Sequence, residues 1–363
     1  MAITFTNGIT ISNYLYPFTS FMFTTARVSG STGPLGTTIL AAYTGSSSGS
    51  YFSNRDYFTT GSFQGYQIWT VPQTATYRVE LAGARGGTST AYSASLTWGN
   101  GAIIRADIAL TQGQKLMMVV GQYTDGNGAN ANQYATYQGY GGGGGSFLTL
   151  SGSIPTPLLV AGGGGGTGKY TNGLFTGKNG TTGPSGSASV RGATGGSGSL
   201  GGRSHINSAS VVSVNAYDGG GGAGFIGNGY NGDGTLTKPY NGGTYGEGGY
   251  SFVSGSKGGQ EGSSWGRPST YAGGAGGFGG GGAGNGIIVG GGGGGYSGGG
   301  GAYTNVATQA DGGGGGGSYI YSLATNVATS DGNYDGLNTF SGSNVTNLNS
   351  YNSGNGYIQI TKL

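Results

Sequence analysis

The sequence predicts a mainly β protein in which a sheet core carries an inserted bundle of glycine-rich helices of the polyproline II type. Gly accounts for 91 of the 363 residues, and much of it stands in uninterrupted runs. Several other segments alternate apolar and polar residues with the period of a half-buried strand. The chain holds 26 Tyr, 13 Phe and 3 Trp but is only 7% charged, whereas disordered chains are poor in aromatic residues and rich in charge. An ordered fold is therefore expected despite the glycine content.

Residues 1–70 are predicted to form a lead segment of short strands and turns that attaches the protein to a larger assembly. The segment has few Gly runs and many Tyr and Phe residues, and its only charged residues are Arg27, Arg55 and Asp56. It is short for an independent domain, so much of its apolar surface needs a partner or the sheet core to cover it.

A sheet core, expected to be a β-sandwich, is predicted over residues 71–161 together with 350–363. Tyr77 and Val79 share one face of a strand, and Arg78 lies on the other. The same alternation recurs along the chain, and the last instance ends at the final residue, which predicts a strand that returns to close the sheet. The expected strands span residues 76–82, 102–110, 115–120, 146–150, 157–161 and 356–363.

Residues 162–349 are predicted to form the glycine-rich bundle and its loops. A polyproline II helix has three residues per turn and no internal hydrogen bonds, so neighbouring helices must pair its buried amides. Gly lets backbones approach closely enough for this pairing, because it has no Cβ. The collagen Gly-X-Y period is missing, and Pro is too scarce for it. The runs span residues 141–145, 162–166, 219–222, 279–282, 290–295, 298–301 and 312–317.

The junctions between strands and glycine runs resemble those of known glycine-rich proteins. The motifs concerned are Pro157–Gly166, Gly141–Phe147, Gly291–Gly299 and Gly313–Ile320, with Phe18–Phe21 and Trp69–Pro72 ahead of Tyr77–Ala84. They are similar to the glycine-rich region of the anaplastic lymphoma kinase and leukocyte tyrosine kinase ectodomains, and to glycine-rich tail-fibre and virion proteins of tailed phages. The first resemblance implies a tumour-necrosis-factor-like β-sandwich, or jelly roll, with an inserted glycine-helix bundle, and with it a homotrimer. The chain has no Cys and no kinase region, so the phage setting fits better than a receptor.

Composition narrows the setting further. The 14 basic and 11 acidic residues are scattered singly and give a net charge of +3, so there is no basic footprint for nucleic acid. The first residues lack the charged and apolar regions of a signal peptide. This favours a protein made in a host cytoplasm and localised to the virion.

The leading functional hypothesis is a structural or receptor-binding component of a tailed-phage virion, such as a tail fibre, a tip adhesin or a decoration protein. Its expected partners are other virion proteins, further copies of itself, and a host cell-surface glycan or protein. The alternative is a cellular extracellular adhesin or matrix filament protein. Neither hypothesis needs a cofactor.

Two aromatic clusters are predicted to contact the receptor. Rings flanked by amide side chains suit saccharide or protein surfaces. The alternative is that the rings cap the glycine bundle, because large aromatic side chains are the main apolar area available to it. The predicted contact residues are Tyr134, Tyr137 and Tyr140 in one loop and Trp265, Arg267 and Tyr271 in another.

A near P-loop precedes Lys169. Tyr170 stands where Ser or Thr would hold magnesium, and no helix is predicted to follow, although a phosphate loop requires one. The motif therefore does not predict nucleotide binding.

An acidic turn at residues 331–336 matches half of a calcium loop. Asp331, Asn333 and Asp335 stand at alternate ligand positions, but Gly342 occupies the acidic twelfth position. A turn capped by its own side chains is favoured, and no metal site is assigned, although calcium binding by these residues is left open.

The sequence shows no grouping of residues that is typical of a catalytic site. His205 is the only His and has no acidic neighbour, whereas nucleophilic catalysis requires a base oriented by a third group. A non-enzymatic protein is expected.

Overall fold

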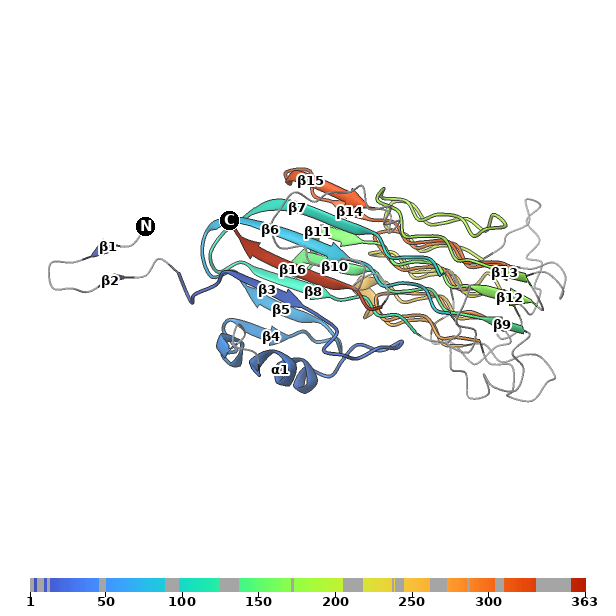
Figure 1. Cartoon of the computed structure of the whole chain (residues 1–363), viewed down its shortest axis with the longest axis horizontal. Helices are drawn as coiled ribbons and strands as arrows, with labels where there is room; N and C mark the ends of the chain where they lie inside the picture. Colours follow the sequence, from blue (N-terminus) through green and yellow to red (C-terminus); the bar gives the residue numbers. More distant parts are fainter. Residues whose placement is uncertain are drawn as a thin grey trace.

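The computed structural model places a β-sandwich at one end of the molecule and the glycine-rich bundle at the other (Figure 1). The C-terminus lies at the sandwich end (Figure 1). The structure describes residues 3–4, 10–11, 14–45, 50–88, 98–124, 137–170, 173–204, 218–236, 238, 245–261, 273–285, 288–303, 310–330 and 354–363.

Two antiparallel sheets make the sandwich. The six-stranded sheet has the order β14-β11-β10-β8-β5-β4, with strands β4 (Phe58–Thr60), β5 (Gln67–Thr70), β8 (Lys115–Val119), β10 (Ser146–Leu150), β11 (Thr156–Ala161) and β14 (Tyr319–Ile320). The five-stranded sheet has the order β15-β7-β6-β16-β3, with strands β3 (Ser20–Phe23), β6 (Ala75–Ala82), β7 (Ile103–Leu110), β15 (Thr325–Ser330) and β16 (Tyr357–Lys362). The predicted mainly β fold is confirmed.

The remaining elements are short. Strands β1 and β2 pair only with each other, and β9, β12 and β13 form a three-stranded sheet far from the sandwich (Figure 1). Their bounds are β1 (Ile3–Thr4), β2 (Thr10–Ile11), β9 (Tyr137–Gly139), β12 (Gly168–Tyr170) and β13 (Gly173–Phe175), and the helices are α1 (Gly36–Thr44), η1 (Ser50–Ser53) and η2 (Phe252–Ser254).

The predicted strands of the core are confirmed as β6, β7, β8, β10, β11 and β16. The C-terminal strand closes the five-stranded sheet as expected, because β16 pairs with β6 from Tyr357 opposite Ala82 to Lys362 opposite Tyr77. Side chains that alternate inward on both sheets meet in one apolar core around Trp69, which is fully buried.

The sandwich uses more of the chain than the sequence predicts. Strands β3, β4 and β5 come from residues 1–70, and β14 and β15 come from residues 162–349. Phe21 and Phe23 are buried in the core, so the aromatic residues of the lead segment belong to the sandwich. Strands β3, β4, β5 and β14 have only two to four residues, too short for a clear period-two pattern, and β15 is mostly polar in sequence, which is why the expected boundaries missed them.

The glycine runs form neither α-helix nor β-strand, and their amides donate mainly to other glycine-rich segments of the bundle. In the run 290–295, residues three apart donate to the same neighbouring segment, so this run meets three neighbours in turn. The donors and acceptors are Gly291 and Gly294 to Tyr140 and Gly143, Gly290 and Gly293 to Asp311 and Gly314, and Gly292 and Gly295 to Gly220 and Ala223.

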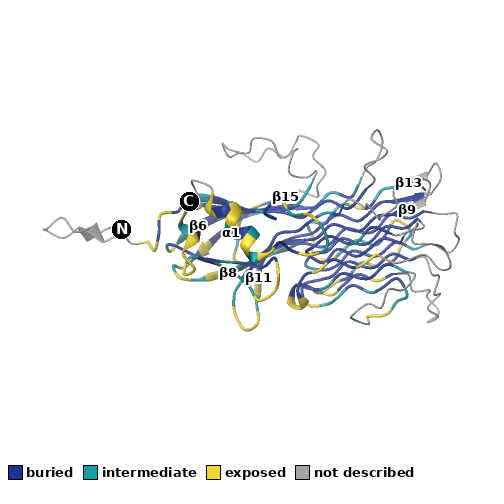
Figure 2. Cartoon of the chain, turned by 90° about the horizontal axis from the view of Figure 1, so that it is seen from below, coloured by how far each residue is buried: buried dark blue, intermediate teal, exposed yellow. Residues whose placement is uncertain are grey.

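Backbones in the bundle approach too closely for side chains. A Cβ on Gly293 would lie 2.2 Å from the carbonyl oxygen of Gly163, a distance that real Cβ atoms do not reach. The runs are accordingly buried along their length, while exposed residues gather in the turns and on the sandwich (Figure 2). Gly is required here for close packing of one backbone against another.

Aromatic residues join the bundle to the sandwich. Phe225, Phe252 and Phe278 lie at turns between glycine segments and are buried against Phe147 of β10 and Val160 of β11. These two strand residues face away from the sandwich core, so the turns cover the outer face of the six-stranded sheet.

Candidate functional site

The candidate site is the end of the bundle farthest from the sandwich, which we call the distal end. Sheet β9-β12-β13 lies there (Figure 1). Several segments that connect glycine runs have their flanking residues, here called stems, close together at this end. The segments are 125–136, 205–217, 262–272, 286–287 and 304–309.

Backbone hydrogen bonds link these stems to one another. They run from the amide of Gly274 to Gly139 at 2.9 Å, from Gly284 to Gly274 at 2.8 Å, from Gly290 to Asp311 at 3.0 Å and from Gly219 to Ala302 at 2.8 Å. All four donors are Gly, which has no Cβ and so lets the stem backbones approach closely. The stems at the distal end thus form a hydrogen-bonded platform, from which the connecting segments begin.

The described flanks of the two predicted contact clusters share one part of this platform. Gly139 precedes the glycine run of the first cluster, and its carbonyl oxygen accepts from Gly274, which follows the second cluster. The hydroxyl of Thr124, on the other side of the first cluster, donates to the carbonyl oxygen of Ala275. The flanks of two clusters that are far apart in sequence therefore lie side by side.

The structure describes only some of the predicted contact residues. Tyr134, Trp265, Arg267 and Tyr271 lie outside the described residues, and Tyr137 is placed only by its backbone, opposite Tyr170 in β12.

Tyr140 is only 2% exposed, so its ring is not presented to a partner. For this residue the capping interpretation holds, and its assignment as a contact residue is corrected, because it enters the packed bundle rather than the loop before it.

Asp311 joins the two stems of segment 304–309 to the part of the chain around residues 189–191. Its carboxylate accepts hydrogen bonds from the Ser189 hydroxyl at 3.0 Å, the Arg191 amide at 3.1 Å and the Tyr303 amide at 3.3 Å. The residue is fully buried. Burial raises the pKa of the Asp311 carboxyl to about 6, although these hydrogen bonds and the Arg191 charge act in the opposite direction.

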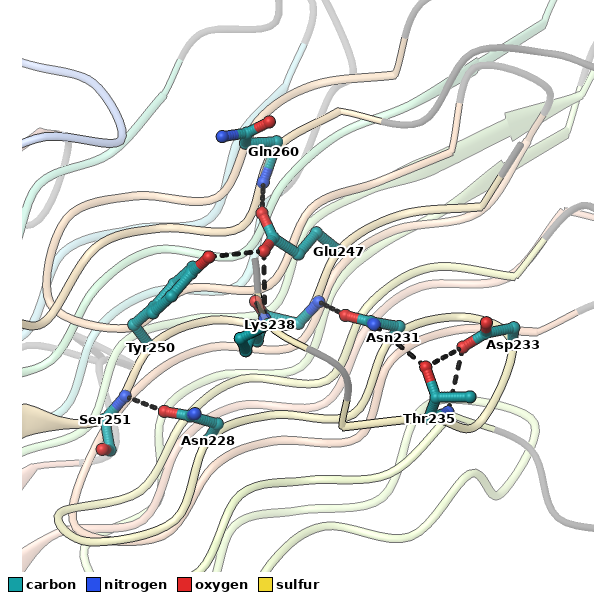
Figure 3. A network of polar contacts seen from close by, with 10 residues as sticks. Asn228, Asn231, Asp233, Thr235, Lys238, Glu247, Tyr250, Ser251 and Gln260 are labelled. Atoms are coloured by element: carbon teal, nitrogen blue, oxygen red, sulfur yellow. Dashed lines mark hydrogen bonds and ion pairs between the residues drawn. The ribbon is translucent and has the colours of Figure 1, made fainter. Parts of the chain in front are cut away.

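A second buried carboxylate, that of Glu247, anchors a network shown in Figure 3. It accepts from Lys238 Nζ at 3.2 Å, the Tyr250 hydroxyl at 2.8 Å and the Gln260 amide at 2.7 Å. Burial is the largest influence on Tyr250 and raises its hydroxyl pKa to about 12.

Sequence reasoning missed Asp311, Glu247 and Lys238. Each is a lone charge inside a glycine-rich, nearly uncharged part of the chain. A charge that interrupts such a region is a usable signal, because a buried charge needs partners.

The near P-loop is used for packing. The amides of Gly163 and Gly166 donate to Gly294 and Gly291, and Lys169 lies buried on strand β12 rather than at the start of a helix. The glycines therefore have their amides turned to other runs instead of to an anion.

The remaining sequence features that could bear on function are His205, the acidic turn, metal sites and membrane-spanning helices. His205 and the acidic turn with Asp331, Asn333 and Asp335 lie outside them. Within the described ranges no group of three or more His, Asp or Glu side chains is placed to hold a metal ion. Among the helices in those ranges, none has the length and apolarity to cross a membrane.

Comparison with known proteins returns no relatives: no protein-family model matches the chain, and no curated protein matches it.

Proposed function

We propose that this protein is a non-enzymatic structural and receptor-binding component of a tailed-phage virion, as a tail fibre, tip adhesin or decoration protein, and that its distal end contacts a host-surface glycan or protein. The observation that carries the proposal is the bonded platform of stems, where Gly139 and Gly274 join the flanks of both predicted contact clusters. A rigid platform lowers the ordering cost when its segments meet a partner.

The glycine runs are, in this proposal, polyproline II helices. Such a helix has three residues per turn, and donors three residues apart in 290–295 meet the same neighbour. The tumour-necrosis-factor-like jelly roll and the homotrimer rest on the family resemblance, and two packed antiparallel sheets are compatible with the jelly roll. Closed symmetric assembly is also the usual form of structural proteins.

Attachment to the particle is assigned to the first residues of the chain. Strands β3 to β5 are integral to the sandwich, and α1 and η1 pack buried residues against its core, whereas β1 and β2 belong to neither large sheet. Residues 1–13 are therefore the part of the lead segment that we assign to attachment. Strands β1 and β2 bond only to each other, and an isolated two-stranded hairpin is marginal in water. Other virion proteins are its proposed partners.

The test is the position and orientation of the protein on intact particles. Electron cryomicroscopy of particles, with an antibody fragment raised against the distal end, should place the sandwich toward the particle and the fragment at the outer tip. Absence of the protein from particles, or a distal end turned inward, would exclude the proposal and favour the alternative of a cellular adhesin or matrix filament protein.

A further inference from the structure

An exposed arginine lies on a tyrosine ring at the distal end of the bundle. Arg203 stands in the stem before segment 205–217, and its guanidinium carbon lies 4.9 Å from the centre of the Tyr230 ring. Arg203 is exposed, and Tyr230 is partly exposed. A guanidinium over the face of an aromatic ring is attracted by the negative charge of that face, so the ring restricts the positions that the guanidinium adopts.

Backbone hydrogen bonds hold both residues of this pair. The Arg203 amide donates to the carbonyl oxygen of Thr194 at 2.9 Å, and the Gly301 amide donates to the carbonyl oxygen of Arg203 at 2.9 Å. The Tyr230 amide donates to Gly202, the residue before Arg203, at 3.1 Å. The packed bundle therefore positions the pair before a partner arrives, which lowers the entropy cost of binding.

The Arg203 charge has no acidic partner in the described ranges. Lys238 of the same bundle is paired with Glu247 (Figure 3), whereas the described contact of the Arg203 guanidinium is with the Tyr230 ring. Contact with a ring face uses none of the five N–H donors of a guanidinium. These donors are therefore available to an external anion.

We propose that Arg203 and Tyr230 form a contact site for an anionic saccharide, in which the guanidinium binds a carboxylate or phosphate group carried by a sugar. The inference rests on the proposed function, because it names the class of host-surface ligand that the distal end takes. A guanidinium presents N–H donors in a planar fork that matches two oxygens of a carboxylate or phosphate. Tyr230 and the exposed Thr194 add hydroxyl groups, which can both donate to and accept from the hydroxyls of a sugar.

The experiment is titration calorimetry of the full-length protein with two acidic trisaccharides and their neutral matches. The probes are trigalacturonic acid with its methyl ester, and maltotriose carrying a terminal 6-phosphate with plain maltotriose. At least one acidic probe should bind, and its neutral match should bind at least about tenfold more weakly, because the match lacks the charge that the guanidinium pairs with. The acidic probe that binds more tightly identifies the anionic group. Absence of binding by both acidic probes, or equal binding of acidic and neutral probes, would overturn the proposal.

Two variants test the residues of the site. Arg203→Lys keeps the charge but loses the planar fork, and it should bind the acidic probe at least about tenfold more weakly than wild type. Tyr230→Leu keeps the charge but loses the ring that positions it, and it should also bind more weakly. Both should melt like wild type, because Arg203 is exposed and Tyr230 is partly exposed. Unchanged affinity in either variant would overturn the pairing of these two residues.

The matched control is Lys257→Met, which removes an exposed cation from another segment of the bundle. It should bind the acidic probe like wild type. A loss equal to that of Arg203→Lys would show attraction by net charge alone and would overturn the site.

The site and the proposed host contact can fail separately, because saccharide binding is measured on the isolated protein. Saccharide binding through Arg203, without competition for adsorption of the phage, would support the site and count against the proposed function. Competition that Arg203→Lys leaves unchanged, with no binding of the acidic probes, would keep the proposed function and overturn the site.

Discussion

The backbone amide of Gly294 donates to the carbonyl oxygen of Gly143 at 2.9 Å, joining two glycine runs that stand far apart in the chain. Bonds of this kind replace the local hydrogen bonds of an α-helix, so no run can satisfy its amides alone. Ordering Gly also costs more backbone entropy than ordering other residues. We therefore expect the bundle to fold as a unit, with the loss of one run unfolding its neighbours.

Gly293→Val should abolish folding of the bundle. The new Cβ would lie 2.2 Å from the Gly163 carbonyl oxygen. Its nearest atoms are all backbone, which cannot turn aside as a flexible side chain would, so the loss should exceed about 4 kcal/mol. Thermal unfolding and solubility are the measurements. Gly183→Val is the control, because nothing lies within 4 Å of a Cβ there; equal tolerance of both variants would contradict close packing at Gly293.

The turns that carry Phe225, Phe252 and Phe278 should be the main link between bundle and sandwich. Phe252 is 1% exposed, so Phe252→Ala should cost about 3–5 kcal/mol. Tyr66→Phe should cost about 1–2 kcal/mol, because its hydroxyl bonds Ser256 Oγ at 2.8 Å and the carbonyl oxygen of Phe252. Chemical denaturation measures both losses. A neutral Phe252→Ala would mean that the turns do not hold the two parts together.

Asp311 should make stability depend on pH between about 4 and 6. Its folded-state pKa is raised from 3.8 to about 6, so the folded protein binds a proton in this window that the unfolded chain does not. The unfolding free energy that Asp311 contributes should thus rise as pH falls from 6 to 4, by up to about 3 kcal/mol. Above pH 6 that contribution is lost.

Denaturation of wild type and Asp311→Asn at pH 7, 5.5 and 4.5 checks this, because the wild type should gain relative to the variant as pH falls. Asp107→Asn is the control. Arg78 lowers the pKa of Asp107, so that carboxylate stays ionised across the window and its difference from wild type should stay flat. If the difference in unfolding free energy between wild type and Asp311→Asn also stayed constant from pH 7 to 4.5, the Asp311 carboxyl would not titrate in this range.

Deletion of residues 1–13 should leave the fold intact but prevent incorporation into particles. Strands β1 and β2 make no pairing with the two large sheets, so the melting temperature of the shortened protein should match that of the full chain. Complementation of a gene deletion followed by particle purification measures incorporation. Normal incorporation of the shortened protein would place the attachment surface on the sandwich itself.

The sequence predicts the regular strands because their alternation is long enough to recognise. Residues 75–82 and 103–110 pair along eight positions as β6 and β7, and both show the period-two pattern. By contrast, β3 has only four residues and β14 has two, and their pairing depends on partners far along the chain. Local patterns cannot report such partners, so the expected domain boundaries fell inside the sandwich.

The sequence indicates the two aromatic clusters but not that their flanks lie together, because that proximity also depends on partners far along the chain. Aromatic loops next to glycine runs predict two contact clusters, and the bond between Gly274 and Gly139 places the flanks of both clusters together. That proximity depends on which run neighbours which, and Gly runs carry no side chains that distinguish one neighbour from another. For the same reason Tyr140 could not be separated from its loop neighbours until its burial was known.

The most direct test of the account is whether the distal end binds the host. The purified protein should block adsorption of the parent phage to host cells, and the variant combining Tyr137→Ala, Trp265→Ala and Tyr271→Ala should fold but lose this competition by at least about tenfold, as when central aromatic contacts are removed. Tyr14→Ala with Leu323→Ala, two exposed residues of the sandwich end, should compete like wild type. Undiminished competition by the triple variant, or no competition by the wild-type protein, would contradict the account.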